Sequence, residues 1–455
     1  MVTTHKGEGR RSNSLRILTA VVSIAATGWM SFQSIAHATA RTSRYHLRWP
    51  HAVVPVRKTL KDDSPETKRA IWWNSEKGPK DITTDDLNNG GKAFDGFVVQ
   101  NVRGSHDSAS RGDAFAWDAF TNRRYTLDAS DTAGDYVGDS LDALRNLPSS
   151  PMPDRFLRIN ASPYSAEKFD WTDDAFWNTV VNNMTVASEI CQKAHLTGVF
   201  LDTEQYHRGG KAPNMYMYNE VKFFKKSGDL SYDQMADLVE KRGDQVIKAL
   251  NSHCPNMTII VSFGYITMSQ HVNRRQLASH AYLLTPFLDG MLDGSSSGTR
   301  FVDGFEAAYW HNDSPDFFNS WKHNIKGRDS YNVKFQKYGS QYLNKYDVAV
   351  GLFLDRDRAV GGQKPVYGWC GDNKSEVFYS PGRLAYTVQQ AAKAADKYVW
   401  FYAQKPNAWL PPDSHGGLPS TYIHAIRDGL RHANDSSLSA LSPDNSSAPE
   451  SAVCN

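Results

Sequence analysis

The sequence predicts an α/β fold of the (β/α)8 TIM-barrel type, in a single domain with loop insertions and polar termini. Short runs rich in β-branched and aromatic residues recur eight times, and amphipathic helical patterns lie between most of them. Such alternation places the strands parallel, and eight parallel strands fit a closed barrel. The alternative, an open doubly wound sheet, is disfavoured because no Gly-rich phosphate loop follows the first run.

The predicted strands and helices follow one another along residues 69–432. The strands are RAIWWN (69–74), FDGFVVQN (94–101), RFLRIN (155–160), GVFLDTE (198–204), MTIIVSFGY (257–265), FVDGFEAAYW (301–310), VAVGLFLD (348–355) and YVWFYA (398–403). Helical periodicity is clearest in residues 173–194, 232–251 and the Ala-rich 383–396. We therefore expect one barrel domain over 69–432.

The two ends of the chain differ in composition from this domain. Residues 1–40 carry a basic segment, an apolar run and small residues up to Ala38 and Ala40, the pattern of an export signal cut near one of those alanines. An uncleaved membrane anchor is disfavoured, because the apolar run is shorter than the ~20 residues that a span needs. Residues 41–68 are predicted to be a polar N-terminal arm and 433–455 a Ser/Pro-rich tail. We expect a periplasmic or secreted protein with no membrane association after signal cleavage.

Charge and cysteine content narrow the partners and the compartment. The formal net charge is +2, and removing the leader's net charge of +3 leaves the mature chain near −1. With no basic run, this disfavours nucleic acid as a partner. Four cysteines in an oxidising compartment are expected to pair. Cys191 and Cys254 end consecutive helical segments and form one predicted disulfide, which leaves Cys370 with Cys454.

The alternation of side chains along a strand predicts which residues face the barrel interior. In 198–204, Phe200, Asp202 and Glu204 point inward, and their neighbours pack beneath helices. The same test on the other strands places inward the residues Asn101, Arg158, Asn160, Gly304, Glu306, Ala349, Gly351, Asp355, Trp400, Tyr402 and Gln404. The polar members gather at the C-terminal strand ends, where barrel enzymes build their active sites.

Paired carboxylates at that face are the groups that glycoside hydrolysis requires. One must be protonated to release the leaving oxygen, and the other must be ionised to attack the anomeric carbon or to activate water. Asp202 beside Glu204 would raise the pKa of one of them. We expect Glu204 as the general acid, Glu306 as nucleophile or base, and Asp202 as the residue that tunes Glu204. An alternative makes Asp202 the nucleophile and Glu306 the acid, and the sequence leaves both open.

Aromatic and polar residues near the predicted mouth are candidates for substrate binding. Aromatic residues make up 12% of the chain, and their flat rings suit stacking on sugars as well as packing in the core. The candidate residues are Asp355, Trp400, Tyr402, Trp310, Tyr309, Asn160, Arg158, Tyr206 and Trp409. The segment 356–380 is expected to be a long loop on the same rim.

Three segments carry a resemblance to a known group of proteins. GVFLDTEQY (198–206), FLDGMLDGSSSGTRFVDGFEAAYW (287–310) and YVWFYA together resemble bacterial secreted (β/α)8-barrel proteins described as glycoside-hydrolase-like. The resemblance spans roughly 69 to 432, and its motifs correspond here to Asp202, Glu204, Asp303 and Glu306. Asp202-Thr203-Glu204 also looks like the end of the chitinase-type Asp-x-Asp-x-Glu motif. Phe200 replaces the earlier Asp of that motif, so substrate-assisted chitin cleavage is not expected.

The sequence thus favours a secreted glycoside hydrolase that acts on a polysaccharide or oligosaccharide without cofactor or metal. One alternative is a non-catalytic barrel that binds glycan or cell-wall material through the same mouth. A second is a metal-dependent hydrolase or deacetylase, with Asp202, Glu204, Asp355 and a histidine such as His207 or His311 as ligands. The sugar, the linkage, the stereochemistry and the oligomeric state do not follow from the sequence.

Overall fold

The structure is a computed structural model that describes residues 67–73, 77–106, 114–162, 169–204, 206, 214–223, 229–265, 283–310, 315–327, 337–355, 378–404 and 406–442. All of them belong to one compact unit, Val53–Asn455. The predicted export signal, most of the arm, most of the rim loop 356–380 and most of the tail lie outside the described residues. The boundaries of those segments therefore stay predictions.

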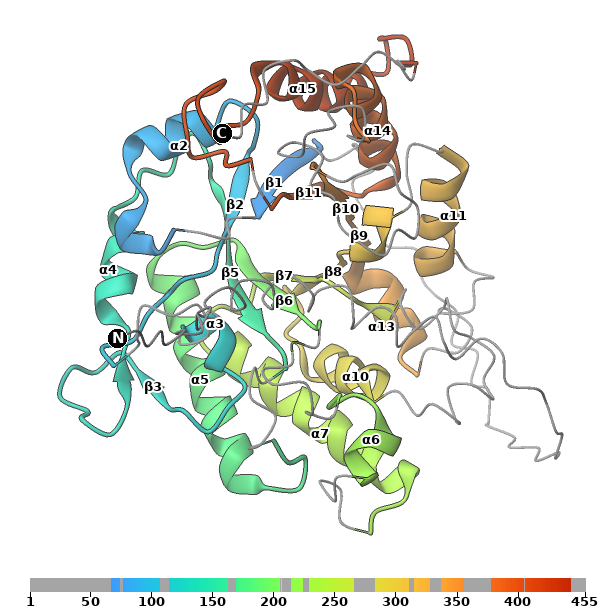
Figure 1. The fold of residues 1–455 in the computed structure, drawn as a ribbon. Helices are drawn as coiled ribbons and strands as arrows, with labels where there is room; N and C mark the ends of the chain where they lie inside the picture. The colour runs from blue at the N-terminus through green and yellow to red at the C-terminus, as the bar shows by residue number, and fades with distance from the viewer. Residues whose placement is uncertain are drawn as a thin grey trace, which may run out of the picture. The chain divides into compact units, whose positions relative to one another are not determined.

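The described chain forms a closed barrel of parallel strands with helices around it (Figure 1). Around the barrel the strands follow the order β10-β11-β1-β2-β5-β6-β7-β8-β9, and every neighbouring pair is parallel. The barrel closes because β9 and β10 are two parts of one strand position, interrupted at Ala349. β9 pairs with β8, and β10 pairs with β11. The predicted (β/α)8 fold is confirmed.

All eight predicted strands are present. The barrel strands are β1 (Arg69–Trp73), β2 (Gly96–Val99), β5 (Asp154–Asn160), β6 (Gly198–Asp202), β7 (Thr258–Val261), β8 (Arg300–Asp303), β9 (Tyr346–Val348), β10 (Val350–Phe353) and β11 (Tyr398–Tyr402). A separate two-stranded sheet of β3 (Tyr125–Thr126) and β4 (Asp135–Tyr136) lies in the connection between β2 and β5. Each of these strands has only two residues, which is too short for an alternating pattern to predict.

Long helices surround the strands (Figure 1), and two short ones contact residues inside the barrel through Trp117 and Tyr309. The helices are η1 (Pro79–Asp81), α2 (Thr84–Gly90), α3 (Phe115–Asp118), α4 (Gly138–Asn146), α5 (Asp174–Lys193), α6 (Tyr218–Phe223), α7 (Tyr232–Asn251), α10 (Leu284–Gly294), η3 (Glu306–Trp310), α11 (Pro315–Lys326), α13 (Gly339–Lys345), α14 (Pro381–Ala394) and α15 (Ser420–Asn434). The three helices predicted from periodicity correspond to α5, α7 and α14. Among the described helices, none combines the length and the apolar character that crossing a membrane requires.

The apolar side chains inside the barrel form one cluster, and those between the strands and the surrounding helices form another. The cluster inside the barrel contains Ile71, Trp73, Val98, Phe156, Phe200, Ile260, Val302, Tyr309, Ala349, Phe353, Tyr398 and Trp400. Val199 and Leu201 of β6 belong to the outer layer, whereas Phe200 between them lies inside. The predicted alternation is therefore confirmed, and the interior is filled by side chains up to the level at which the strands end.

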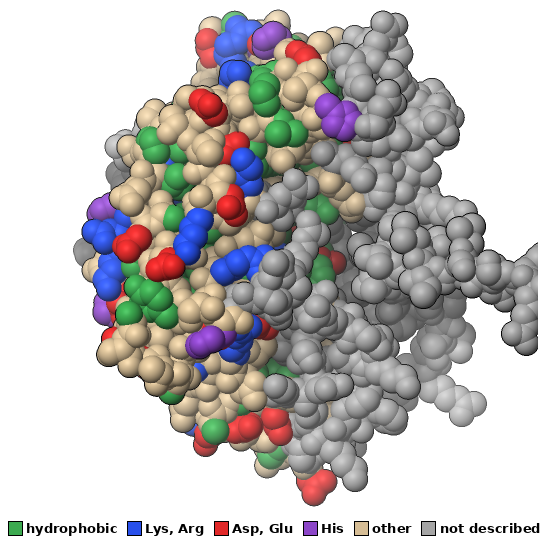
Figure 2. Space-filling view, turned by 60° about the vertical axis from the view of Figure 1, so that its left-hand side comes forward, with side chains coloured by type: hydrophobic (Ala, Val, Ile, Leu, Met, Phe, Trp, Pro, Cys, Tyr) green, Lys and Arg blue, Asp and Glu red, His purple; other side chains and the backbone are tan. Residues whose placement is uncertain are grey.

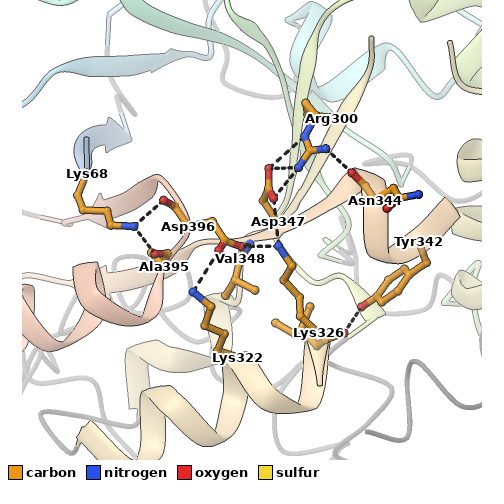
Figure 3. Close-up of polar contacts among 11 residues, drawn as sticks. Lys68, Arg300, Lys322, Lys326, Tyr342, Asn344, Asp347, Val348, Ala395 and Asp396 are labelled. Carbon is orange, nitrogen blue, oxygen red and sulfur yellow. Dashed lines mark hydrogen bonds and ion pairs between the residues drawn. The ribbon is translucent and has the colours of Figure 1, made fainter. Parts of the chain in front are cut away.

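The N-terminal ends of β8, β9 and β11 are joined by an ion-pair network (Figure 3). Arg300 pairs with Asp347 at 2.6 Å, and Lys326 bridges Asp347 and Asp396 at 3.2 and 3.0 Å. Lys322 contacts the same Asp396 at 3.1 Å. Burial alone would raise the pKa of Asp396, but the two lysines outweigh it and lower that pKa. This end of the barrel thus holds its acids ionised.

Basic and acidic side chains are interspersed among neutral ones on the face in Figure 2. This view brings forward the side of the barrel on which α2 and α4 lie. One pair there joins Lys80 and Asp139 at 2.8 Å, with 57% and 65% of their side chains exposed. Ion pairs this exposed contribute only about 0–1 kcal/mol, so this face adds little to stability.

The predicted disulfide between Cys191 and Cys254 is absent, and both thiols are free. The two residues are close enough for Cys254 to influence Cys191, so the predicted proximity is correct. However, the buried Cys191 Sγ donates to the backbone oxygen of Gly198 at 3.6 Å. Burial, followed by the nearby Cys254, raises the pKa of the Cys191 thiol, which keeps it protonated and unreactive. Cys370 and Cys454 lie outside the described residues.

Candidate active site

Three carboxylates converge at the C-terminal face of the barrel. Asp202 is the last residue of β6, Glu204 follows two residues later, and Glu306 begins η3 just after β8. One carboxylate oxygen from each acid lies within 4.8 Å of an oxygen of each of the other two. The fold thus brings together the three acids that the sequence singled out.

Asp202 is fully buried and fully hydrogen-bonded. Its Oδ1 accepts from the Ser262 hydroxyl at 3.1 Å and from the backbone N–H of Glu204 at 3.0 Å. Its Oδ2 accepts from the Tyr206 hydroxyl at 3.1 Å and from the Arg158 guanidinium. Four donors use the acceptor capacity of a carboxylate. Asp202 is therefore fixed in place, which suits a supporting group better than a nucleophile.

Arg158 is the counter-ion of this cluster and lies almost completely inside the barrel, with 2% of its surface exposed. Besides Asp202, its guanidinium donates to Gln100 Oε1 at 3.1 Å. It also lies over the rings of Trp117 and Trp73, 4.1 and 5.0 Å from their centres, where cation–π attraction adds to the ion pair. Burial would lower the pKa of Arg158, but Asp202 more than compensates and raises it.

Glu204 and Glu306 differ from Asp202 because both keep some contact with solvent. Burial, and then the negative charge of Asp202, raise the pKa of Glu204 to about 7, although Tyr206 and Arg158 act in the opposite direction. Burial and the charges of Glu204 and Asp202 raise the pKa of Glu306 well above its ordinary value of 4.5. Two carboxyls this close cannot both ionise freely, so the pair retains a proton at pH values where an isolated carboxyl has lost it.

Glu306 projects from a turn, and the predicted strand 301–310 is wrong beyond Asp303. The strand ends there, and Glu306–Trp310 form the 3-10 helix η3. The reversal occurs at Phe305, whose φ of +47° lies in the left-handed region. Bulky side chains rarely adopt this conformation, so hydrophobic periodicity alone did not predict it.

Aromatic side chains form one wall beside the acids. Tyr309 and Tyr402 stack with ring centres 5.8 Å apart and 17° between their planes, and both contact Phe353. Tyr402 is partly exposed, and Tyr309 lies near enough to Glu306 for that carboxylate to raise its pKa, after the larger effect of burial. On the Arg158 side, the partly exposed Tyr206 packs edge-on against Trp117 at 4.9 Å.

Two of the tryptophans expected at the mouth lie elsewhere. Trp400 faces inward as predicted, but it is fully buried in the interior cluster beneath the acids. Trp409 packs edge-on against Phe97 in the layer outside the strands, because the loop after β11 folds back over that side. Neither ring is accessible to a sugar. The side chain of Trp310 lies outside what the structure describes.

Two further candidates are buried without joining the acid cluster. Asn160 pairs in register with Asp202 across β5 and β6, and its amide donates to the Ser162 carbonyl at 2.9 Å. Asp355 accepts from the backbone N–H of Gln404 at 3.0 Å, which ties the end of β10 to the end of β11. Both are fully buried, so local structure accounts for the contacts they make.

Sequence reasoning missed three residues that contact the site: Gln100, Ser262 and Trp117. Gln100 was within reach of the alternation test, because Val98 is in the interior cluster and Gln100 is two residues further on. The strand 94–101 was instead predicted to present Asn101, one residue out of phase. Trp117 lies on α3, in the long β2–β5 connection, and no sequence signal placed that helix against the barrel mouth.

The three acids are also spaced so that their oxygens could surround a divalent cation. However, both oxygens of Asp202 already accept two hydrogen bonds each, one of them from a buried guanidinium. A cation there would have to displace these donors and would lie close to the positive charge of Arg158, which disfavours the metal alternative. His207 and His311, suggested as further ligands, lie outside the described residues.

No protein-family model matches the chain, and no curated protein matches its sequence. In structure it is similar to a Bacteroidetes-affiliated GH5 cellulase linked with a polysaccharide utilization locus, with a TM-score of 0.42, 7% identity and coverage of 80% of this chain and 91% of that one. For a Pyrococcus horikoshii endocellulase in complex with cellotetraose, the TM-score is 0.40 and the identity 10%, with coverage of 81% of this chain and 92% of that one. For an Anoxybacillus α-amylase, the TM-score is 0.37 and the identity 11%, with coverage of 81% of this chain and 78% of that one. At these scores the barrel assignment rests on the chain's own strand pairing.

Proposed function

We propose that the protein is a glycoside hydrolase in which Glu204 and Glu306 cleave an O-glycosidic bond. The observation that carries this proposal is the pair itself: two partly exposed carboxylates with raised pKa values, within 4.8 Å, at the C-terminal face of the barrel. Glycoside hydrolysis needs one carboxyl that keeps its proton and one that is ionised. A pair that shares one proton meets both needs at once.

Within the pair we assign the proton to Glu306 and the negative charge to Glu204. Burial and the charge of Asp202 raise the pKa of Glu204 to about 7, and Tyr206 acts against that rise, whereas the rise at Glu306 also includes the charge of Glu204. Glu306 would then protonate the leaving oxygen, and Glu204 would attack the anomeric carbon. This exchanges the roles expected from the sequence. Asp202 would orient the pair by accepting the Glu204 backbone N–H, while the ion pair with Arg158 holds Asp202 in place.

We infer a double-displacement reaction with retention of configuration, because one oxygen of Glu204 approaches one of Glu306 to within 4.8 Å. Retaining enzymes hold their carboxyl groups about 5–5.5 Å apart, whereas inverting enzymes need roughly 6.5–9.5 Å to admit a water molecule. Glu204 would form a glycosyl ester as the leaving group departs with the proton of Glu306. The Glu306 carboxylate would then take a proton from water, whose oxygen displaces Glu204 and completes the hydrolysis.

The substrate is proposed to be a polysaccharide or oligosaccharide met outside the cytoplasm. The partly exposed Tyr402, backed by Tyr309 and Phe353, offers a ring on which a sugar can stack beside Glu306. The export-signal pattern of residues 1–40 supports a periplasmic or secreted location.

The test is reducing-end release from a panel of polysaccharides by the chain from Arg41 and by its Glu204→Gln and Glu306→Gln variants. We expect activity in the parent and a loss of roughly 10²–10⁴-fold in each variant, with glycan affinity retained. Glu189→Gln is the matched control, because Glu189 is a partly exposed helical glutamate that pairs with Lys193 instead. It should keep full activity. NMR of the first product anomer should report retention.

Each alternative has its own outcome. Glycans that bind all the proteins equally and are cut by none would replace the hydrolase with a glycan-binding barrel. Activity that is lost with a chelator and restored by a divalent cation would favour a metal-dependent hydrolase. Cleavage that persists in both Gln variants would remove the acid pair from the reaction.

A further inference from the structure

We propose that Trp400 is a positioning residue for Glu306 and acts through the backbone of the turn Gly304–Glu306. This inference rests on the proposed function, in which Glu306 is a reacting carboxylate. The sequence suggested Trp400 as a ring on which a sugar stacks, whereas here Trp400 acts on Glu306 from beneath the site.

One side of the turn is fixed to the neighbouring strand. The N–H of Gly304 donates to the carbonyl of Val261 at 2.7 Å, and the N–H of Glu306 donates to the carbonyl of Ser262 at 3.1 Å. Both acceptors lie at the end of β7, between β8 and the strand that carries Asp202. The turn therefore starts and ends on hydrogen bonds to one strand, and the peptide between them decides where Glu306 points.

That middle peptide is held by Trp400. Its Nε1–H donates to the carbonyl of Gly304 at 2.7 Å, across the barrel interior from β11. The carbonyl belongs to the peptide bond that precedes Phe305, so its orientation is coupled to the φ of Phe305. The N–H of this same peptide bond, which belongs to Phe305, donates to Asp303 Oδ1 at 3.3 Å.

The conformation that results is unfavourable by itself. A φ of +47° at a phenylalanine persists only when the surroundings impose it. The Phe305 ring is held in the outer layer by Trp321 and Phe317 of α11, with ring centres 4.1 and 5.9 Å away. The ring thus anchors the turn from outside the barrel, while Trp400 anchors it from inside. Strained backbone conformations of this kind are common at functional sites, where a side chain must point in one direction.

The packing around Trp400 prevents its indole from moving away from the Gly304 carbonyl. It is fully buried, with the rings of Phe200 and Trp73 at 5.1 and 5.5 Å. A Cβ added at Gly351 would lie 2.7 Å from its ring, so glycine at that position makes the space that it occupies. The interior packing therefore fixes the position of the Trp400 indole. The indole fixes the orientation of the Gly304 carbonyl, and this orientation determines the direction in which Glu306 points.

The test compares Trp400→Phe with Trp177→Phe. Both remove one indole donor to a backbone carbonyl from a fully buried tryptophan, and Trp177 bonds to Asp170 at 3.0 Å in the helical layer. On the glycan that the parent cleaves fastest, Trp400→Phe should lower kcat by roughly 10–100-fold and leave KM within about 2-fold, because the reacting group is misplaced and binding is kept. Trp177→Phe should change neither.

Crystal structures of both variants give a readout that needs no substrate. In Trp400→Phe, we expect φ of Phe305 to become negative and the oxygens of Glu306 and Glu204 to move beyond 4.8 Å. If Trp400→Phe does not fold, Trp321→Leu takes its place, because it loosens the ring anchor from outside and should give the same changes more weakly.

A turn that keeps its positive φ together with an unchanged kcat overturns the inference. If the parent cleaves no glycan, the proposed function fails while the crystal structures still decide the inference. A relaxed turn with displaced Glu306 would then support the positioning role of Trp400, and an unchanged turn would remove it.

Discussion

The two ends of the barrel hold buried acids in opposite ways. At the N-terminal face, Asp396 contacts Lys322 and Lys326, and its pKa is lowered. At the C-terminal face, Glu204 and Glu306 approach each other and Asp202, and their pKa values are raised. Burial acts in the same direction at both ends, so the neighbouring charges make the difference.

This contrast separates charges that stabilise the fold from charges that cost stability. The network around Asp396 pairs each acid with a cation and joins strand ends. In the acid cluster, Arg158 is the cation that the structure places against Asp202, and it leaves two further carboxylates to share a proton. A local excess of like charge in a folded protein is most easily understood where function requires a poised acid.

Replacing Arg158 by Met should give the largest effect on stability. It leaves Asp202 buried without its counter-ion, which costs about 3–5 kcal/mol of unfolding free energy. Because Arg158 lowers the pKa of both Glu204 and Glu306, the same change should raise both values further. Urea denaturation measures the loss, with Arg145→Met as the control, since Arg145 is 56% exposed. Equal stability of the two variants would mean that the buried ion pair between Arg158 and Asp202 does not stabilise the fold.

Replacing Asp396 by Asn should destabilise the protein at pH 7 by about 1–2 kcal/mol. A lowered pKa means that the folded state favours the carboxylate, so this stability is present above the ordinary value of 3.8 and is lost as the pH falls through the folded-state pKa. The difference from the parent should therefore shrink below about pH 4. Asp428→Asn, at a side chain that is 52% exposed, should show no such trend in parallel denaturation curves.

Replacing Glu204 by Gln should change stability in the opposite direction from the Asp396 variant. A raised pKa means that the folded state favours the protonated form, so stability is full below 4.5 and is lost as the pH rises through about 7. Gln cannot ionise, and the variant should be more stable than the parent by about 1–2 kcal/mol at pH 8, with no difference at pH 4. Glu189→Gln serves as the control. A variant that is less stable than the parent at pH 8 would contradict the comparison of the two ends.

The strands of the barrel and most of its inward residues could be predicted from the sequence, because a period of two is a strong local signal. Asp202 and Glu204 follow from it directly. The phase error at Gln100 arose because Phe97, Val98 and Val99 are all apolar, so no alternation marks the inward face, and a shift by one residue reverses it. The split of β9 from β10 at Ala349 had no local signal, since it depends on pairing with two different neighbours.

What the sequence could not provide was the path of the chain after the strands. Glu306 was chosen by continuing a strand that in fact ends at Asp303, and it reaches the site through the positive φ of Phe305. Trp400 was predicted to face inward, but its depth in the barrel depends on packing from several strands. The free thiols of Cys191 and Cys254 likewise show that proximity does not by itself determine a disulfide.

A ¹³C NMR titration of the glutamate carboxyls tests most directly whether the fold poises these two acids, and it needs no substrate. In the parent, Glu204 should titrate near pH 7 and Glu306 well above its ordinary value. In Glu204→Gln, the pKa of Glu306 should fall, because that variant removes a negative charge that raises it. Two carboxyls that both titrate near 4.5 in the parent would contradict the shared proton and, with it, the proposed catalytic pair.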